Sequence, residues 1–204
     1  MLNYYCCYQC GIALQTSELT EQRCTVCQKN QPYFDETYCL DRYEGLLQKP
    51  LHALKYQKRI AFANAISQTW NSVLGKDLEN ISADFLLPVP LSTEKLTLRG
   101  FNQSWELARR VHCGRHTQKS PYILRRHHRP GHQAGSTLDS RRFAIRDMFY
   151  VEHKYIERLK NKTLIVFDDV MTSGATLNEI ARVLKDNGVS RVINWVVLRA
   201  ARPI

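Results

Sequence analysis

The sequence lacks the features of a membrane or secreted protein. No stretch approaches the roughly 18 consecutive apolar residues of a membrane-spanning helix. The segment Met1–Cys6 also lacks the basic region and apolar run of a secretory signal. We therefore expect no leader and no membrane span, and a cytoplasmic location.

Acidic residues are scarce as well. Nineteen Asp and Glu stand against 29 Lys and Arg, which gives a formal charge of +10 over 204 residues. The hydrophobic content of 44% is typical of a packed core and excludes a disordered basic tail. The length allows one domain with an appendage. The charge indicates an anionic partner, whether nucleic acid, a membrane surface or a phosphorylated metabolite.

Aliphatic residues are few in residues 1–40, so this segment needs a cross-link or a metal to fold. Clustered cysteines in a reducing compartment are more typical of metal ligands than of disulfides. The spacing Cys7-x-x-Cys10 and Cys24-x-x-Cys27 predicts a closed four-thiolate site, and hence a structural zinc knuckle. Cys6 could replace Cys7 as a ligand, Cys39 could be a spare ligand or a core residue, and buried or incidental cysteines remain the alternative. We expect the knuckle to span residues 1–42 and a larger domain to span 43–204.

The larger domain shows alternating helix and strand patterns. Continuous apolar runs between helices predict a parallel sheet that is covered on both faces, and therefore an α/β fold. Residues 112–142 are polar and basic and predict a loop or hairpin. Helices are expected as two short elements within 44–70, over 102–111 and over 175–185, and strands over 84–90, 143–151, 163–167 and 192–198.

The most specific motif follows the strand over 163–167. Asp168 and Asp169 end this strand, and a loop of small residues around Gly174 leads into a helix. Ligands bind at the carboxyl ends of strands in open α/β sheets, and a helix N-terminus binds anions. The hydroxyls of Thr172, Ser173 and Thr176 add donors, so the segment predicts a phosphate cradle, although an ordinary helix cap is the alternative. The glycine and lysine pattern of a P-loop is absent.

This segment resembles the phosphoribosyl pyrophosphate (PRPP) motif of type I phosphoribosyltransferases. The resemblance implies that Asp168 and Asp169 bind the ribose hydroxyls as the catalytic pair, and that the loop binds the 5-phosphate. The implied PRPP-binding residues are Asp168, Asp169, Val170, Met171, Thr172, Ser173, Gly174, Ala175 and Thr176.

The rest of the chain resembles the ComF family, whose members are linked to natural DNA transformation. The resemblance is carried by the cysteine pairs, by Leu54-Lys55-Tyr56, and by Leu87–Leu91 with Arg99–Gln103. It implies that Arg99 and the backbone at Gly100 contact pyrophosphate. It also places the family's flexible hood over residues 125–142, with Gln133, Gly135 and Arg141, although the spacing there departs from the family pattern.

The resemblance implies a PRPP-binding phosphoribosyltransferase-like protein, with Mg²⁺ arriving together with PRPP. Transfer would expel pyrophosphate through an oxocarbenium-like state. No segment specifies an acceptor, so binding of PRPP is better supported than transfer. A nucleobase-salvage enzyme and a non-enzymatic nucleic-acid-binding module are the alternatives.

Most of the excess charge lies in one segment. Residues 99–146 hold eleven Lys or Arg against two acids. Single-stranded DNA is a natural second partner. Lys and Arg side chains can neutralise its phosphates, and its bases can stack on aromatic rings such as those of Tyr4, Tyr5, Tyr8 and Tyr33. Other competence proteins are further expected partners. A merely solubilising basic face is the competing interpretation.

Overall fold

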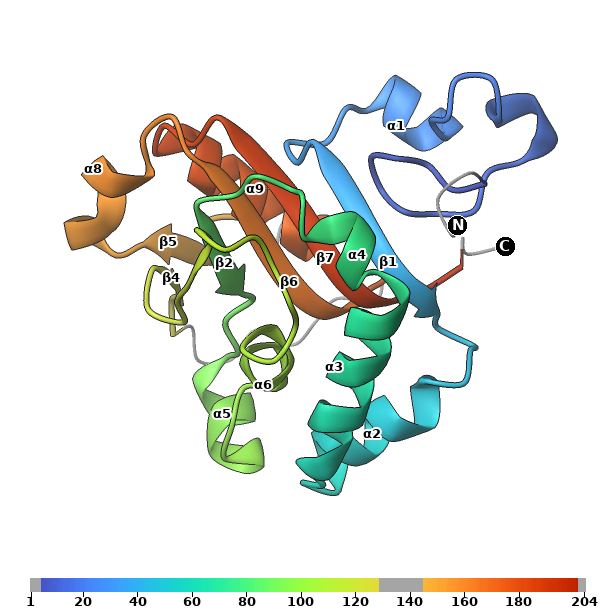
Figure 1. Ribbon diagram of the computed structural model, residues 1–204. Coiled ribbons are helices and arrows are strands. Elements are labelled where there is room, and N and C mark those ends of the chain that lie inside the picture. The colour runs from blue at the N-terminus through green and yellow to red at the C-terminus, as the bar shows by residue number, and fades with distance from the viewer. Residues whose placement is uncertain (1–4, 129–144, 202–204) are drawn as a thin grey trace.

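The computed structural model describes residues 5–128 and 145–201. A five-stranded sheet with the order β1-β7-β6-β2-β3 forms the centre, and all its pairings are parallel (Figure 1). A separate antiparallel ribbon joins β4 to β5. The strands are β1 Glu36–Arg42, β2 Phe85–Pro88, β3 Gln118–Lys119, β4 Leu124–Arg126, β5 Phe149–Val151, β6 Thr163–Met171 and β7 Arg191–Arg199. The helices are η1 Thr16–Glu18, α1 Thr25–Lys29, α2 Gln48–Tyr56, α3 Ala61–Val73, α4 Gly75–Leu78, α5 Thr93–Arg99, α6 Gln103–Ala108, η2 His153–Tyr155, α8 Ile156–Leu159 and α9 Ala175–Asp186.

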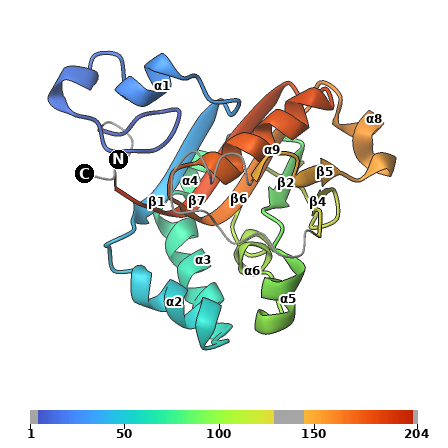
Figure 2. The ribbon, with the colours of Figure 1, turned by 180° about the vertical axis from the view of Figure 1, so that it is seen from behind.

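Alternation along the buried strands gives the sheet two apolar faces. In β6, Leu164 and Val166 belong to the core that α9 and the N-terminal cysteines cover. Ile165 and Phe167 belong to the opposite core, which α2, α3 and α6 cover. Figure 1 shows α3 and α6 in front of the sheet, and the reverse view in Figure 2 shows α9 in front. The predicted α/β fold with both faces covered is confirmed.

The helices expected within 44–70 are α2 and α3, and those expected over 102–111 and 175–185 are α6 and α9. Strand β6 runs beyond the expected end at Phe167, because its pairing with β7 continues through Asp168 to Met171. No helix was expected between the strand over 84–90 and the helix over 102–111. Helix α5 forms there, with Ser92 as its N-cap and Gly100 in the left-handed conformation after its last residue.

Strand β1 lies on the knuckle side of the boundary expected after residue 42. It pairs in parallel with β7 from Glu36 to Arg42 and forms one edge of the sheet. The boundary itself stays a prediction. The segment over 112–142, predicted to be a loop or hairpin, contributes the short strands β3, which pairs with β2, and β4, which pairs antiparallel with β5. The proposed hood residues Gln133, Gly135 and Arg141 lie outside the described residues.

Across residues 5–128 and 145–201, none of the helices has both the length and the apolar character needed to cross a membrane.

Candidate functional site

Two adjacent acids lie near the carboxyl end of β6, in contact with residues of α2 and α6. Asp168 and Asp169 are both buried. The Oδ1 of Asp168 accepts hydrogen bonds from Ser104 Oγ at 3.2 Å and from the backbone N–H of Asp169 at 2.9 Å. Burial, reinforced by the neighbouring charge of Asp169, raises the pKa of Asp168 well above its usual range. The pair can therefore hold a proton, or accept hydrogen bonds from a diol.

Lys55, at the end of α2, forms a largely buried ion pair with Asp169. Sequence reasoning found Lys55 within a family motif but gave it no role. The ion pair brings the C-terminal turn of α2 to the end of β6. Any ligand that hydrogen-bonds to Asp169 therefore meets this ammonium group as well.

The loop after β6 has the backbone of an anion-binding turn. Gly174 has φ +79° and directly precedes α9, whose first N–H groups have no acceptor within the helix. A Cβ at this position would lie 2.6 Å from Met171 Cε, so the loop has no room for one without movement of that side chain. The side chains of Thr172 and Ser173 are exposed, and Ala175 and Thr176 are half-buried at the start of the helix. The predicted loop residues are thus brought together.

Arg99, the last residue of α5, is buried and held by other elements. Its Nη1 donates to Gln103 Oε1 at 2.8 Å, and its guanidinium carbon lies 5.2 Å from the centre of the Tyr56 ring. Gly100 follows with φ +82° and is open to solvent. Arg99 therefore connects α5, α6 and the end of α2 beside the acids.

Further cations gather here that sequence reasoning missed. Burial lowers the pKa of Lys95, and the charges of Arg126, Arg99 and Lys55 lower it further, while Asp169 opposes them. Arg126 itself is half-buried and packs 5.6 Å from the centre of the Phe149 ring. We call Lys55, Lys95, Arg99 and Arg126 the cation cluster. Arg126 was counted in the basic segment and in the hood without a role of its own, and Lys95 was not singled out, because only the fold brings α5 and β4 together.

The N-terminal cysteines form a compact group. The sulfurs of Cys7, Cys10, Cys24 and Cys27 all lie within 4.8 Å of one another, and those of Cys10 and Cys24 are 3.6 Å apart. Four thiolates placed about 2.3 Å from a tetrahedral ion would be about 3.8 Å apart, so the group fits a metal ion such as Zn²⁺. The turn is closed by Gly11, whose N–H donates to Cys7 O at 2.8 Å. Four of the seven cysteines can therefore hold a structural metal.

The four thiols also share protons with one another. Hydrogen bonds, first with Cys10, lower the pKa of Cys7 and lower that of Cys24 to about 6. The same network raises the pKa of Cys10 and Cys27. A divalent cation replaces such shared protons, because cysteine binds metals as the thiolate.

Cys6 and Cys39 stand apart from the four-sulfur group among the described residues. Burial raises the pKa of Cys6, and it raises the pKa of Cys39 to about 12. A Cβ on Gly11 would lie 2.6 Å from Cys39 Sγ, so Cys39 fills space beneath the knuckle turn. The geometry therefore selects Cys7 over Cys6 as the ligand.

The tyrosines considered as stacking surfaces are accessible. Tyr5, Tyr8 and Tyr33 are 70%, 46% and 48% exposed, whereas Tyr4 lies outside the described residues. At the opposite end of the molecule, the β4-β5 ribbon carries a stacked His127–Tyr150 pair whose ring centres are 4.4 Å apart. We call residues 5–30, which contain the four-cysteine group, the cysteine module. Both views place this module and the β4-β5 ribbon at opposite edges of the five-stranded sheet (Figures 1 and 2).

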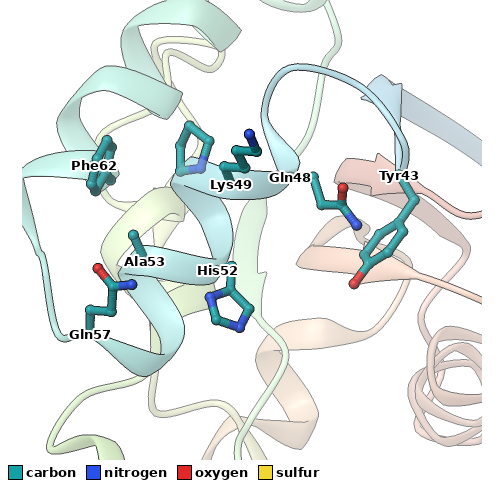
Figure 3. A pocket seen from close by; sticks show the side chains of 8 residues that line it. Tyr43, Gln48, Lys49, His52, Ala53, Gln57 and Phe62 are labelled. Atoms are coloured by element: carbon teal, nitrogen blue, oxygen red, sulfur yellow. The ribbon is translucent and has the colours of Figure 1, made fainter.

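A cleft of about 560 Å³ lies along α2 (Figure 3). Its lining contains none of the acids, loop residues or members of the cation cluster. It adjoins the site through His52, whose ring centre is 4.6 Å from that of Tyr56 beneath Arg99. The lining residues are Tyr43, Gln48, Lys49, Pro50, His52, Ala53, Gln57 and Phe62.

Comparison with known proteins agrees with this geometry. Residues 121–203 match the family described as phosphoribosyl transferase domain. Over 200 residues the chain is 27% identical to the DNA utilization protein YhgH of Escherichia coli O157:H7, covering 95% of this chain and 83% of that protein. Over 197 residues it is 25% identical to Competence protein F of Haemophilus influenzae, covering 95% and 84%. The predicted relationship to competence proteins with a phosphoribosyltransferase-type domain is confirmed.

Among solved structures, the chain is similar to one described as the structure of the allosteric regulatory enzyme of purine biosynthesis. The identity is 14% and the TM-score is 0.40. The alignment covers 71% of this chain and 29% of that longer one.

Proposed function

We propose that this protein binds PRPP together with Mg²⁺ and acts in the uptake or use of DNA, in the manner of a ComF-type phosphoribosyltransferase-like protein. One observation carries the proposal. The acidic pair, the phosphate loop and the cation cluster converge at the carboxyl edge of the sheet. A ligand with a diol, a phosphate and a pyrophosphate needs these three groups side by side.

The phosphate loop suits the 5-phosphate of PRPP. Residues Val170 to Thr176 lead from β6 into α9, so the N–H groups of the first helical turn can point at phosphate oxygens. Thr172, Ser173 and Thr176 add hydroxyl donors. Asp168 and Asp169 would accept hydrogen bonds from the ribose 2′ and 3′ hydroxyls. In this role they would be the catalytic pair.

The cation cluster suits the pyrophosphate. Partial burial lowers the pKa of the half-buried Arg126, and partial burial together with the charges of Arg126, Arg99 and Lys55 lowers the pKa of Lys95, which stays exposed on α5. An anion between the two side chains would offset both effects. Arg99 and the backbone at Gly100 complete this side of the site. Mg²⁺ favours a few carboxylates together with ligand oxygens, so the acids and PRPP would hold it jointly, and it would supply charge neutralisation of the leaving group.

The same arrangement suits transfer of the ribosyl group. The bond between C1 and the pyrophosphate oxygen breaks, both bonding electrons leave with pyrophosphate, and an acceptor forms the new bond at C1. The protein would need no nucleophile of its own, because the cation cluster stabilises the departing charge. A screen of nucleobases for pyrophosphate release tests the alternative function in nucleobase salvage.

Zinc on Cys7, Cys10, Cys24 and Cys27 completes the proposal. A four-thiolate site has no open position, so the metal would act in folding and not in catalysis. Reduced thiols in this arrangement fit a cytoplasmic location.

Calorimetry with PRPP and Mg²⁺ tests the site. We expect wild type to bind, and the double substitution Asp168→Asn/Asp169→Asn to weaken binding at least about tenfold, because hydrogen bonds to charged groups are worth roughly 1.5–3 kcal/mol. Asp186→Asn, which removes an exposed carboxylate at the far end of α9, is the matched control and should bind as wild type does. Equal affinity in all three proteins would contradict the assignment.

Single-stranded DNA is the second proposed ligand, supported by the exposed Tyr5, Tyr8 and Tyr33. Base stacking on aromatic rings is worth roughly 1–3 kcal/mol per base. Tyr8→Ser should therefore weaken binding of a fluorescent oligonucleotide about tenfold, whereas the exposed Tyr43→Ser should not. Binding that is absent in wild type, or that does not fall between low and physiological salt, would remove this partner.

A further inference from the structure

Arg199 ends strand β7 and is buried between the cysteine module and the phosphate loop. The side chain is 8% exposed. Its four described hydrogen bonds all go to backbone carbonyls. A guanidinium is suited to this position, because its planar fork satisfies several acceptors in fixed directions.

These bonds join the two functional parts of the molecule. Nε donates to the carbonyl of Cys10 at 2.8 Å, and Cys10 also contributes a sulfur to the four-cysteine group. Nη1 donates to the carbonyl of Met171 at 3.1 Å and to that of Thr172, where the phosphate loop begins. The Arg199 side chain is therefore hydrogen-bonded both to the backbone of a candidate metal ligand and to the backbone of the anion-binding turn.

A second contact links the same two parts. The N–H of Tyr33, in the segment that follows the cysteines, donates to Asn178 Oδ1 at 2.7 Å. Asn178 lies in the first turn of α9, and its own N–H donates to Gly174 O at 2.9 Å. The four sulfurs also share one apolar core with Met171 and Leu177. The end of β7 approaches the N-terminal module in both views (Figures 1 and 2).

We infer that Arg199 is a positioning residue that couples the metal state of the four-cysteine group to the conformation of the phosphate loop, and thereby to affinity for PRPP. The last clause of this inference rests on the proposed function. Arg199 would act without touching the ligand, through the carbonyls of Met171 and Thr172. A metal ion would fix the backbone of Cys10, and Arg199 would pass that constraint to the loop.

Coupling of this kind is reciprocal. If zinc strengthens PRPP binding by a given factor, PRPP must strengthen zinc binding by the same factor. A higher zinc affinity in the presence of PRPP, measured at equilibrium by competition with a chromogenic chelator, would therefore report the coupling without any assay of activity.

Hydrogen exchange of the loop provides a test that does not depend on PRPP. Mass spectrometry would follow the amides of residues 172–178 in wild type, in Arg199→Lys and in the control Arg191→Lys, each with zinc and after its removal. Arg191 is an exposed arginine at the other end of β7, paired with Glu36. Amides of residues 164–167, in the core of the sheet, report any general unfolding.

We expect the loop in zinc-loaded Arg199→Lys to exchange about tenfold faster than in wild type, with the amides of 164–167 unchanged. Removal of zinc should speed exchange of the loop amides in wild type and in Arg191→Lys, but should add much less in Arg199→Lys, where the Tyr33–Asn178 contact and the shared core still link the two parts. A loop that is unchanged by Arg199→Lys, or that zinc removal speeds equally in all three proteins, would overturn the inference.

A PRPP titration of the same samples separates the two proposals. Affinity that falls about tenfold in Arg199→Lys and also on zinc removal from wild type supports the coupling. PRPP affinity that is equal in every sample overturns the link to the ligand. If wild type binds no PRPP while its loop still responds to zinc through Arg199, the proposed function fails and the coupling of module to loop stands.

Discussion

Burial gives Asp168 chemistry that an exposed aspartate lacks. Because its pKa is raised in the folded protein, ionisation of Asp168 opposes folding. Wild type therefore keeps its full stability below the unfolded pKa of about 4 and loses part of it as pH rises through the higher folded pKa. Asp168→Asn cannot ionise, so it should melt above wild type at pH 7 and level with it near pH 3.5.

Thermal unfolding between pH 3.5 and 8 measures this difference. Asp186→Asn removes an exposed carboxylate that forms a surface ion pair with Arg182, and is the control. A melting temperature of Asp168→Asn that lies below wild type at pH 7 would contradict the prediction. The gain would come with weaker PRPP binding, since function commonly opposes stability at such sites.

Two glycines frame α9 and allow a matched comparison. Gly174 and Gly188 have φ of +79° and +85°, a conformation that costs other residues roughly 1–2 kcal/mol. Gly174→Ala and Gly188→Ala should therefore lower the free energy of unfolding by similar amounts, measured with urea. Gly174→Ala alone should weaken PRPP binding, because its methyl group displaces Met171 beneath the loop. Equal PRPP affinity in the two variants would contradict the role of the loop.

Residues of the site differ in how far the sequence could reveal them. The cysteine pairs, the acids and the loop are contiguous or regularly spaced along the chain, so the sequence alone was enough to predict their chemistry. Lys55, Lys95 and Arg126 come from three separate elements and meet only in the fold. Their charge was visible as composition, but their convergence around Lys95 depends on tertiary packing.

At the scale of elements, the start of α6 positions Ser104 against Asp168. Asn102 caps this helix, with its Oδ1 accepting from Ser104 N at 2.9 Å, and its Nδ2 donates to Val89 O at 3.0 Å. Asn102→Ala should cost about 1–2 kcal/mol of unfolding free energy, since it removes a cap and a tether. Ser92→Ala, at the exposed cap of α5 whose bond is 3.4 Å long, should cost less.

Urea denaturation of both cap variants measures these costs. A smaller loss for Asn102→Ala than for Ser92→Ala would show that the tether to Val89 contributes nothing.

Elements were predictable where their pattern was long and regular. The segments that became β6 and β7 are continuous apolar runs, and the segment that became α9 repeats apolar residues on one helical face, so the types of all three were predicted correctly. Helix α5 was missed because its seven residues are mostly exposed and carry no apolar face, although Ser92 and Gly100 mark its ends. Strand β1 was missed because its seven residues mix acidic, basic and apolar side chains and form no continuous apolar run.

At the scale of the whole molecule, the cysteine module stabilises the sheet as well as itself. Its sulfurs share a core with α9 and β6, and Thr37 of β1 donates to Gln9 O at 2.6 Å. Purified protein should contain one zinc ion per chain. Its removal should lower the melting temperature by several degrees, because metal binding contributes to folding.

Metal analysis and calorimetric melting check this expectation. Cys10→Ser should lose zinc and melt early, whereas Cys113→Ser, at a half-buried cysteine outside the module, should keep both properties. An unchanged melting curve after chelation would mean that the four thiols do not form a structural site.

The pairing of β1 with β7 has a consequence for how the protein is made. The two strands meet through residues as far apart as Thr37 and Asn194, 157 positions along the chain, and β1 is the edge of the sheet. On the ribosome, all four cysteines of the module emerge long before β7 is translated. The module can therefore take up its metal on the nascent chain, while β1 has no strand to pair with until residues 191–199 have been synthesised.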